Sequence, residues 1–236
     1  MKSLGVIPAR FASTRFPGKP LVDIRGKSMI QRVYEQALKS NLYKVVVATD
    51  DDRIAEEVTR FGGEFVMTAS THQSGTDRCA EVVKNLPGYD VVINIQGDEP
   101  FIDPLQINLI NDCFADENVQ LATLIKEIHG EEELFNPNIP KVVIGNQQQA
   151  LYFSRHPIPY LRDPSATHQF YKHIGIYGYK TATLLAITQL KPSLLELAES
   201  LEQLRWIENG YQIQTRLTNI ETIAIDSPSD LLKINF

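Results

Sequence analysis

Three cations in one loop near the N-terminus have the spacing and surroundings of a binding site for a small polyanion. Arg10, Arg15 and Lys19 lie in the stretch IPARFASTRFPGKPL, directly behind the first apolar run, and no acidic residue precedes Asp23. Small residues between the cations permit close approach of the backbone, so amides can point at phosphate oxygens while the cations neutralise charge. The alternative is a solvated basic loop, but such a loop is uncommon behind a buried strand in an acidic domain. We therefore expect the loop to bind a triphosphate.

Two aspartates at the ends of apolar runs are candidate ligands for a divalent cation. Asp98 follows VVINIQG, and Asp226 ends TIAID. A carboxylate at the carboxyl end of a strand is well placed to hold Mg²⁺ against phosphates. Asp98 stands beside Glu99 next to buried residues, and two such acids are costly unless paired or bound to metal. Asp226 has an equally good structural alternative, because it precedes a helix start where Ser227 can be the N-cap.

Two common phosphate-binding motifs are excluded by their spacing. Gly26, Lys27 and Ser28 match the end of a P-loop, but Leu21 stands where that motif needs its upstream glycine. The dinucleotide fingerprint G-x-G-x-x-G does not follow the first apolar run either. The basic loop, if it binds phosphate, therefore belongs to neither class.

Apolar runs that alternate with helical stretches predict the framework that positions these residues. Up to about residue 130, runs rich in Val and Ile without polar alternation indicate a mainly parallel sheet covered on both faces. We predict an α/β fold with a Rossmann-like, mixed but mostly parallel central sheet and helices on both faces. Strands are expected at residues 3–8, 44–49, 64–67, 90–96 and 120–128, and helices at 28–40, 52–62, 75–86 and 104–114.

After residue 130 the apolar runs no longer alternate regularly with helical stretches. The whole chain, 1–236, is predicted to be one domain, with an inserted, strand-rich subdomain at approximately residues 130–200. Within and after this insert we expect strands at 141–145, 149–155, 171–180, 212–217 and 222–226, a long loop at 156–170, helices at 181–190 and 194–210, and a last helix from Pro228.

Composition excludes several classes of protein. The 236 residues are 43% apolar, as in an ordinary globular protein. The net charge of −6 argues against general binding to nucleic acid or to anionic lipid. No apolar stretch is long enough to span a membrane, and Pro8 interrupts any signal-peptide core. Cys79 and Cys113 lack metal-ligand spacing and are expected to be buried thiols. We expect a cytoplasmic protein.

The order of the motifs resembles the 3-deoxy-manno-octulosonate (KDO) cytidylyltransferases, the CMP-KDO synthetases of lipopolysaccharide assembly. The resemblance covers essentially the whole chain and rests on IPARFASTRFPGKPL, ATDDDRI, HQSGTDR, INIQGDEPFI, FNPN, LYFSR, HIGIYGY, LEQLR and IDSPSDL. The first motif indicates only the wider nucleotidyltransferase group, whereas QSGTDR, QGDEP and HIGIYGY together are far more specific. The resemblance implies transfer of CMP from CTP to KDO with release of pyrophosphate, with Asp98 and Asp226 holding Mg²⁺.

The resemblance also distributes roles among the candidate residues. The nucleotide is expected to contact the basic loop and two later motifs, through Ala9, Arg10, Ser13, Lys19, Ser74, Arg78 and Gln96. The residues expected to bind the acceptor sugar acid are Arg15, Arg155, His173, Tyr177, Glu202 and Gln203. Catalysis is assigned to charge stabilisation by Arg10, Lys19 and Asp98, because such transfers depend mainly on positioning and electrostatics. No general base is evident.

Several of these residues have a structural alternative. Ser74 can be a helix N-cap, Tyr177 can fill a strand face, and a lone strand histidine such as His173 is most often structural. Glu202 and Arg205 are three residues apart and can form an ion pair on a helix surface.

Two functional alternatives also stay open. One is a cytidylyltransferase for another acidic sugar, such as sialic acid or amino-KDO, and the other is a catalytically silent nucleotide-binding protein. Acceptor contacts from residues 156–170 cannot be assigned. The resemblance suggests a homodimer formed through the strand-rich insert.

Overall fold

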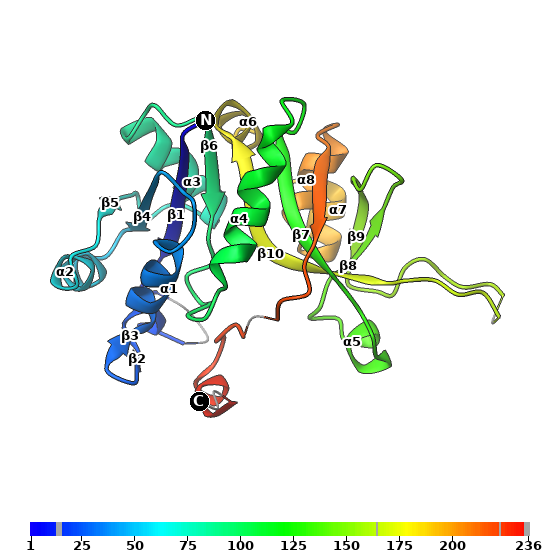
Figure 1. Ribbon diagram of the computed structural model, residues 1–236, viewed down its shortest axis with the longest axis horizontal. Helices are drawn as coiled ribbons and strands as arrows, with labels where there is room; N and C mark the ends of the chain where they lie inside the picture. The colour runs from blue at the N-terminus through cyan, green and yellow to red at the C-terminus, as the bar shows by residue number, and fades with distance from the viewer. Residues whose placement is uncertain (13–15, 164, 222, 234–236) are drawn as a thin grey trace.

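A mixed sheet runs through the middle of the molecule (Figure 1). The computed structural model describes residues 1–12, 16–163, 165–221 and 223–233. Its main strands are β1 (Ser3–Ala9), β4 (Lys44–Thr49), β5 (Phe65–Met67), β6 (Val91–Asn94), β7 (Leu121–Glu127), β8 (Lys141–Ile144), β9 (Ala150–Ser154), β10 (Tyr171–Lys180) and β11 (Ile213–Leu217). Two short strands, β2 (Asp23–Ile24) and β3 (Lys27–Ser28), pair separately.

The strand directions confirm the predicted fold class. The order is β11-β7-β10-β6-β1-β4-β5, with β8 beside β10 and β9 beside β8. β1 is parallel to β4 and β6, β4 to β5, and β7 to β11. β10 is antiparallel to β6, β7 and β8. All strands along this path except β10 therefore point the same way, and their carboxyl ends meet at one edge.

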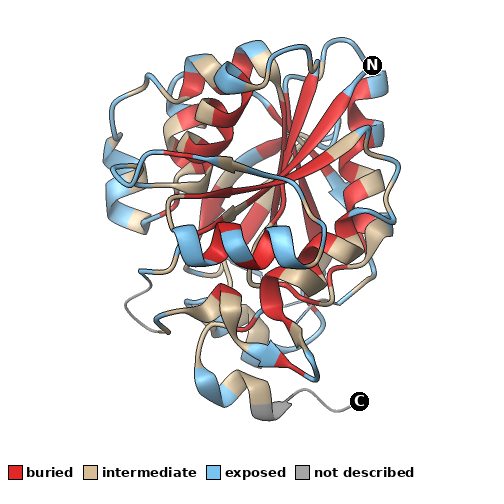
Figure 2. Cartoon of the chain, turned by 90° about the vertical axis from the view of Figure 1, so that its left-hand side faces the viewer, coloured by how far each residue is buried: buried red, intermediate tan, exposed pale blue. Residues whose placement is uncertain are grey.

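Helices cover both faces of the sheet (Figure 1). They are α1 (Met29–Ala37), α2 (Asp52–Arg60), α3 (Gly75–Asn85), α4 (Pro104–Asp112), α5 (Glu131–Phe135), α6 (Thr181–Ile187), α7 (Leu194–Glu199) and α8 (Gln203–Glu208). Side chains of β4 alternate between two apolar clusters. Val45 and Val47 pack with residues of α1, α2 and α4, whereas Val46 and Ala48 pack with residues of α3, α6 and α8. Figure 2 shows the resulting buried layer along the sheet and the inner helix faces.

Local capping explains where the helices near the site begin. Ser74 is the N-cap of α3 and forms a capping box with Asp77, which satisfies amides at the helix start. Ser28 caps α1 by accepting from the Gln31 amide. The Gln31 side chain donates to Glu35 instead of returning to the cap, so only half of a capping box forms at this helix start.

The structure corrects the end of one predicted strand and shows that another predicted strand does not form. β1 continues through Pro8 to Ala9, because its ladder with β6 stops at Val6 and a missing amide costs little beyond that point. Residues 223–226, predicted as part of a strand, form none. The Ile225 amide there donates to the Asp98 carbonyl (2.9 Å).

Two predicted helices also differ. The helix expected over residues 194–210 is divided into α7 and α8 by Ser200, which adopts a left-handed conformation (φ 52°). The break lets Leu204 and Trp206 pack into the core, whereas Leu194 and Leu197 stay exposed. The last helix, Pro228–Lys233, is a 3₁₀ helix.

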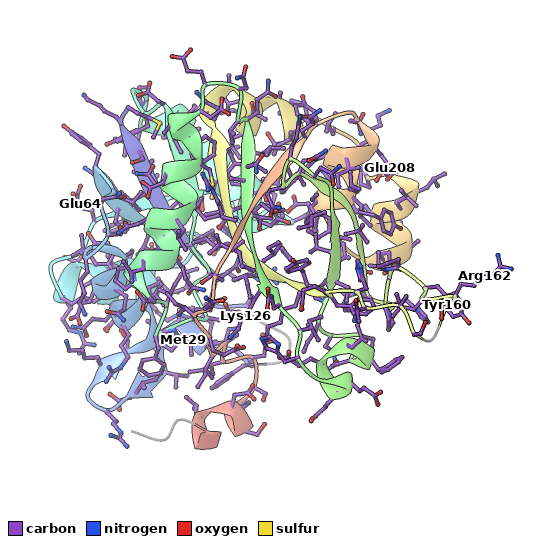
Figure 3. The ribbon with its side chains drawn as sticks, turned by 45° about the vertical axis from the view of Figure 1, so that its right-hand side comes forward. Met29, Glu64, Lys126, Tyr160, Arg162 and Glu208 are labelled. Atoms are coloured by element: carbon purple, nitrogen blue, oxygen red, sulfur yellow. The ribbon has the colours of Figure 1, made fainter. Side chains whose placement is uncertain are left out.

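The strand-rich range 130–200 contributes the antiparallel pair β8 and β9, while β10 from the same range lies within the central sheet. Between β9 and β10 the chain makes a long loop that extends from the body (Figure 1). Tyr160 and Arg162 lie toward its far end (Figure 3).

The expected buried thiols are present in the structure. Cys79 and Cys113 are buried and carry free thiols. Among the helices of the described ranges, we find none with both the length and the apolar character that crossing a bilayer requires.

Candidate active site

A polar cleft of about 260 Å³ opens at the carboxyl ends of β1 and β6. This is the edge at which ligands of open parallel sheets bind. Many residues predicted to contact the nucleotide or metal line it: Ala9, Arg10, Lys19, Ser74, Arg78, Gln96, Asp98 and Asp226. The chain thus brings together residues that are more than 200 positions apart in the sequence.

A second cavity of about 170 Å³ adjoins the first. The two share four lining residues: Pro8, Gly75, Gln96 and Gly97. The second is also lined by His173, Tyr177 and Glu202, which were predicted to bind the acceptor. Three of the predicted acceptor residues therefore lie beside the predicted nucleotide residues of the first cavity.

Lys19 stands between the two predicted metal ligands. Its ammonium lies 2.8 Å from a carboxylate oxygen of Asp98 and 3.5 Å from one of Asp226. The backbone bond from Ile225 to the Asp98 carbonyl holds the two aspartate-bearing segments together. We expected Lys19 to face phosphate, whereas here it neutralises the two carboxylates.

The donor set around Lys19 fits a hard divalent cation. Both aspartates have an oxygen within 3.5 Å of one ammonium, so they converge on a space that a single cation can fill. Within the described ranges, no group of three or more acidic, histidine or cysteine side chains forms a metal cage. Mg²⁺ is commonly bound by one or two carboxylates, with phosphates and water as further ligands. The pair of aspartates matches that pattern.

Gly97 places Asp98 at the cleft. An added Cβ at residue 97 would lie 2.7 Å from the carbonyl oxygen of Pro8, which is closer than real Cβ contacts allow. Only glycine therefore lets the end of β6 approach the end of β1 so closely.

The remaining nucleotide candidates are held by other protein groups. Arg78 is buried, and its guanidinium donates to Asp50 (2.9 Å) and to the Thr68 hydroxyl (2.7 Å). Gln96 donates to the Gly175 carbonyl (2.6 Å) and thereby joins β6 to β10 between the two cavities. The Ser74 hydroxyl accepts from Asp77, so the expected N-cap role is present.

On the acceptor side, an irregularity in β10 places His173 and Tyr177. The register of β10 against β7 shifts between Ile174 and Tyr177, as in a β-bulge beside an active site. The ring centroids of His173 and Tyr177 are 5.2 Å apart. Burial lowers the pKa of His173 to about 4, so its imidazole is neutral at neutral pH.

Glu202 faces the same cavity from the start of α8. It accepts a hydrogen bond from the Thr76 hydroxyl (2.8 Å). Burial raises the pKa of its carboxyl, and the Thr76 hydrogen bond only partly opposes this. The structural alternative, an ion pair between Glu202 and Arg205, is not what the structure shows, because Arg205 is paired with Glu196 of α7 (2.5 Å).

Two acceptor predictions lie elsewhere, and two further predicted residues cannot be placed. Arg155 lines neither cavity, and its guanidinium donates to the carbonyls of Pro137, Glu199 and Ser200. Gln203 is buried in α8, and its amide nitrogen has no hydrogen-bond partner among the described residues. Ser13 and Arg15 lie outside the described residues.

Two residues that belong to the first cavity and its surroundings, Asp50 and His72, were not identified from the sequence. Asp50 follows β4 and anchors Arg78, and His72 lines the first cavity. Asp50 was detectable in principle, because it follows a predicted strand at the edge where ligands gather. His72 had no comparable signal, since it lies in an irregular stretch between β5 and α3.

This combination of sheet, basic loop and converging carboxylates defines a nucleotidyltransferase of the α/β class. The chain belongs to the cytidylyltransferase family, whose model matches residues 4–218. It is 58% identical to the 3-deoxy-manno-octulosonate cytidylyltransferase of Parabacteroides distasonis, with 99% of this chain and 96% of that protein covered. It is 56% identical to the enzyme of the same name from Cytophaga hutchinsonii, over 98% and 95% of the two chains.

A solved structure agrees with this assignment. It is a CMP:2-keto-3-deoxy-manno-octonic acid synthetase complexed with CTP, with a TM-score of 0.93 and 45% identity over 99% of this chain and 96% of that one. A thymidylyltransferase structure from Bacillus anthracis, at 17% identity and a TM-score of 0.67, shares the fold alone.

Proposed function

We propose that this chain transfers the CMP group of CTP to KDO, giving CMP-KDO and pyrophosphate for lipopolysaccharide biosynthesis. The observation that carries the proposal is the cluster of Lys19, Asp98 and Asp226 in a cleft that adjoins a second cavity, which is lined by His173, Tyr177 and Glu202. The names of the relatives and of the CTP-bound structure support the same reaction.

In this proposal the basic loop binds the phosphates. Arg10 at the cleft rim and Lys19 within it take the β- and γ-phosphates, and Lys19 exchanges its two aspartates for phosphate oxygens as the nucleotide enters. Asp98 and Asp226 would then hold Mg²⁺, which supplies charge neutralisation at the phosphates when bound. Arg10 and Lys19 stabilise the charge that develops on the leaving pyrophosphate.

The second cavity orients the sugar acid. The anomeric hydroxyl oxygen forms a bond to the α-phosphorus, the bond from that phosphorus to the bridging oxygen breaks, and the hydroxyl proton passes to solvent. Neutral His173 and the Tyr177 hydroxyl can hydrogen-bond sugar hydroxyls, and Glu202 can accept from one. Positioning of the two substrates is thus the main contribution of this half of the site.

The test is pyrophosphate release from CTP in the presence of Mg²⁺ and purified sugar acids. We expect release with KDO, and its loss in Asp98→Asn, a variant of nearly the same size that lacks one cluster charge. Release only with sialic acid or amino-KDO would replace the acceptor named here. Release with none of them would leave a silent nucleotide-binding protein.

We also propose a homodimer, with the insert at approximately 130–200 as the acceptor-binding and dimerisation part of a single domain. Exposed apolar side chains gather on this part of the chain, including Leu151, Tyr160, Leu194 and Leu197. A cytoplasmic location stays a prediction from the sequence.

A further inference from the structure

Two lysines stand directly opposite each other near the acceptor half of the site. Lys126 of β7 and Lys172 of β10 are register partners in the antiparallel ladder. Like charges directly opposite on neighbouring strands destabilise a sheet. Lys172 is also well buried, with a side chain 7% exposed, so its charge needs an anion nearby.

One carboxylate bridges this pair. One oxygen of Glu221 lies 2.9 Å from the Lys172 ammonium, and its other oxygen accepts from Lys126. Glu133 of α5 gives Lys172 a second anion at 2.5 Å. Burial opposes ionisation of Glu221, but the hydrogen bonds from the two lysines outweigh it and lower the pKa of the carboxyl. Figure 3 labels Lys126 on β7.

Glu221 belongs to the segment that carries Asp226. After β11 the Thr218 amide bonds to the Ile125 carbonyl (2.9 Å), and further on Ile225 bonds to Asp98 and is fully buried. Glu221 lies between these two attachments, in a stretch without regular secondary structure in its described residues. Its two lysine contacts therefore tie the middle of the segment to the sheet.

We propose that Glu221 is a positioning residue: by bridging Lys126 and Lys172 it holds the segment 218–226 and sets the place of the Asp226 carboxylate beside Asp98. The inference rests on the proposed function of the cleft. Its structural part, the tethering of residues 218–226, can be measured without substrate or metal. Substitution of residues that orient metal ligands typically reduces metal affinity or activity by about 10- to 100-fold.

The experiment compares Glu221→Gln with Glu133→Gln. Both variants remove one anion from Lys172, but only the first releases the segment of Asp226. Hydrogen exchange of the Ile225 amide is measured in the metal-free proteins. The Mg²⁺ concentration for half-maximal pyrophosphate release, kcat and KM are measured in the assay. Glu221→Asp, which keeps the charge, tests for rescue.

In Glu221→Gln we expect faster exchange at Ile225, about a 10-fold higher Mg²⁺ requirement and an unchanged KM for the sugar acid. Glu133→Gln should match the wild type in all three, and Glu221→Asp should recover part of the loss. Wild-type exchange and Mg²⁺ dependence in Glu221→Gln would overturn the proposal, as would equal losses in Glu133→Gln. If no variant nor the wild type releases pyrophosphate, the proposed function fails, whereas the exchange data still decide the tethering.

Discussion

At the scale of single residues, the main finding is that the Lys19 ammonium lies between the carboxylates of Asp98 and Asp226. The sequence indicated separately that Lys19 is part of a basic loop and that Asp98 and Asp226 end apolar runs. The structure joins all three, with Lys19 within 3.5 Å of both carboxylates. Sequence spacing could not predict this contact, because it depends on how a C-terminal segment crosses to the end of β6.

Near the acceptor cavity, the sequence predicted which residues line the site but not their pKa values. Motif membership identified His173 and Glu202, and both line the cavity. Their altered acidities could not be predicted, because burial is the largest cause in each case and burial is a property of the packed structure.

His173 should make stability depend on pH. Its pKa in the folded protein is about 4, below the ordinary value of 6.5. Above pH 6.5 the imidazole is neutral in both states. As the pH falls from 6.5 to 4, the unfolded chain takes up a proton that the folded chain does not, so the free energy of unfolding falls. The difference between the two pKa values corresponds to at most about 3 kcal/mol.

Urea unfolding of the wild type and of His173→Asn at pH 7, 5 and 4 measures this term. The wild type should lose up to about 3 kcal/mol more than the variant over that range. His129→Asn, at an exposed position, is the matched control and should track the wild type. Parallel pH profiles for the wild type and His173→Asn would contradict the assignment.

At the scale of elements, local signals predicted most of the framework. The run KVVVAT became β4 with the predicted bounds, and Ser74 capped α3 as its position before the helix indicated. Periodicity failed where tertiary contacts decide the backbone. The predicted helix at 194–210 is divided into α7 and α8 at Ser200, which adopts a left-handed conformation. The apolar run before Asp226 was predicted to be a strand, but its described residues 223–226 form none, and the Ile225 amide bonds to the Asp98 carbonyl.

A prediction at the scale of elements concerns the close approach of Gly97, after β6, to the end of β1. Gly97→Ala would push a methyl group against the Pro8 carbonyl, at 2.7 Å before relaxation. The backbone must shift to relieve the overlap, at a cost of about 1–3 kcal/mol in stability. The shift moves Asp98 relative to Asp226, and a misplacement of about 1 Å can cost about 100-fold in rate.

Thermal unfolding and pyrophosphate release on the same preparation separate the two effects. Gly130→Ala is the control, because a Cβ there meets no atom within 4 Å. Activity in Gly97→Ala should fall far more than its loss of stability accounts for at the assay temperature. Wild-type kcat in that variant would show that Asp98 tolerates the shift.

At the scale of the whole molecule, the strands that share one direction bring their carboxyl ends to one edge, and the site follows from that geometry. Arg10 directly follows β1, and Asp98 lies in the turn after β6. β10 runs the opposite way between β6 and β7, so His173, near its start, lies at the same edge. The fold class could therefore be predicted most completely from the sequence. It also indicated where the site lies, because ligands of open parallel sheets bind at the carboxyl ends of the strands.

The surface of the insert leads to the last prediction, which concerns assembly. Leu194 and Leu197 of α7 are 82% and 65% exposed, and Tyr160 is 88% exposed on the long loop at the same end of the molecule (Figures 1 and 3). Burying a leucine side chain stabilises by about 1.5–3 kcal/mol, and a two-fold interface counts each residue twice. We therefore expect light scattering to give twice the mass of one chain.

Leu194→Glu combined with Leu197→Glu should give the mass of a single chain. The single chain should stay folded, since neither side chain is in the core. Leu105→Glu is the matched control: it is 59% exposed on α4, which covers the other face of the sheet, and it should leave the dimer intact. A wild type that scatters as one chain at micromolar concentration, or a double variant that stays dimeric, would place the contact elsewhere or exclude it.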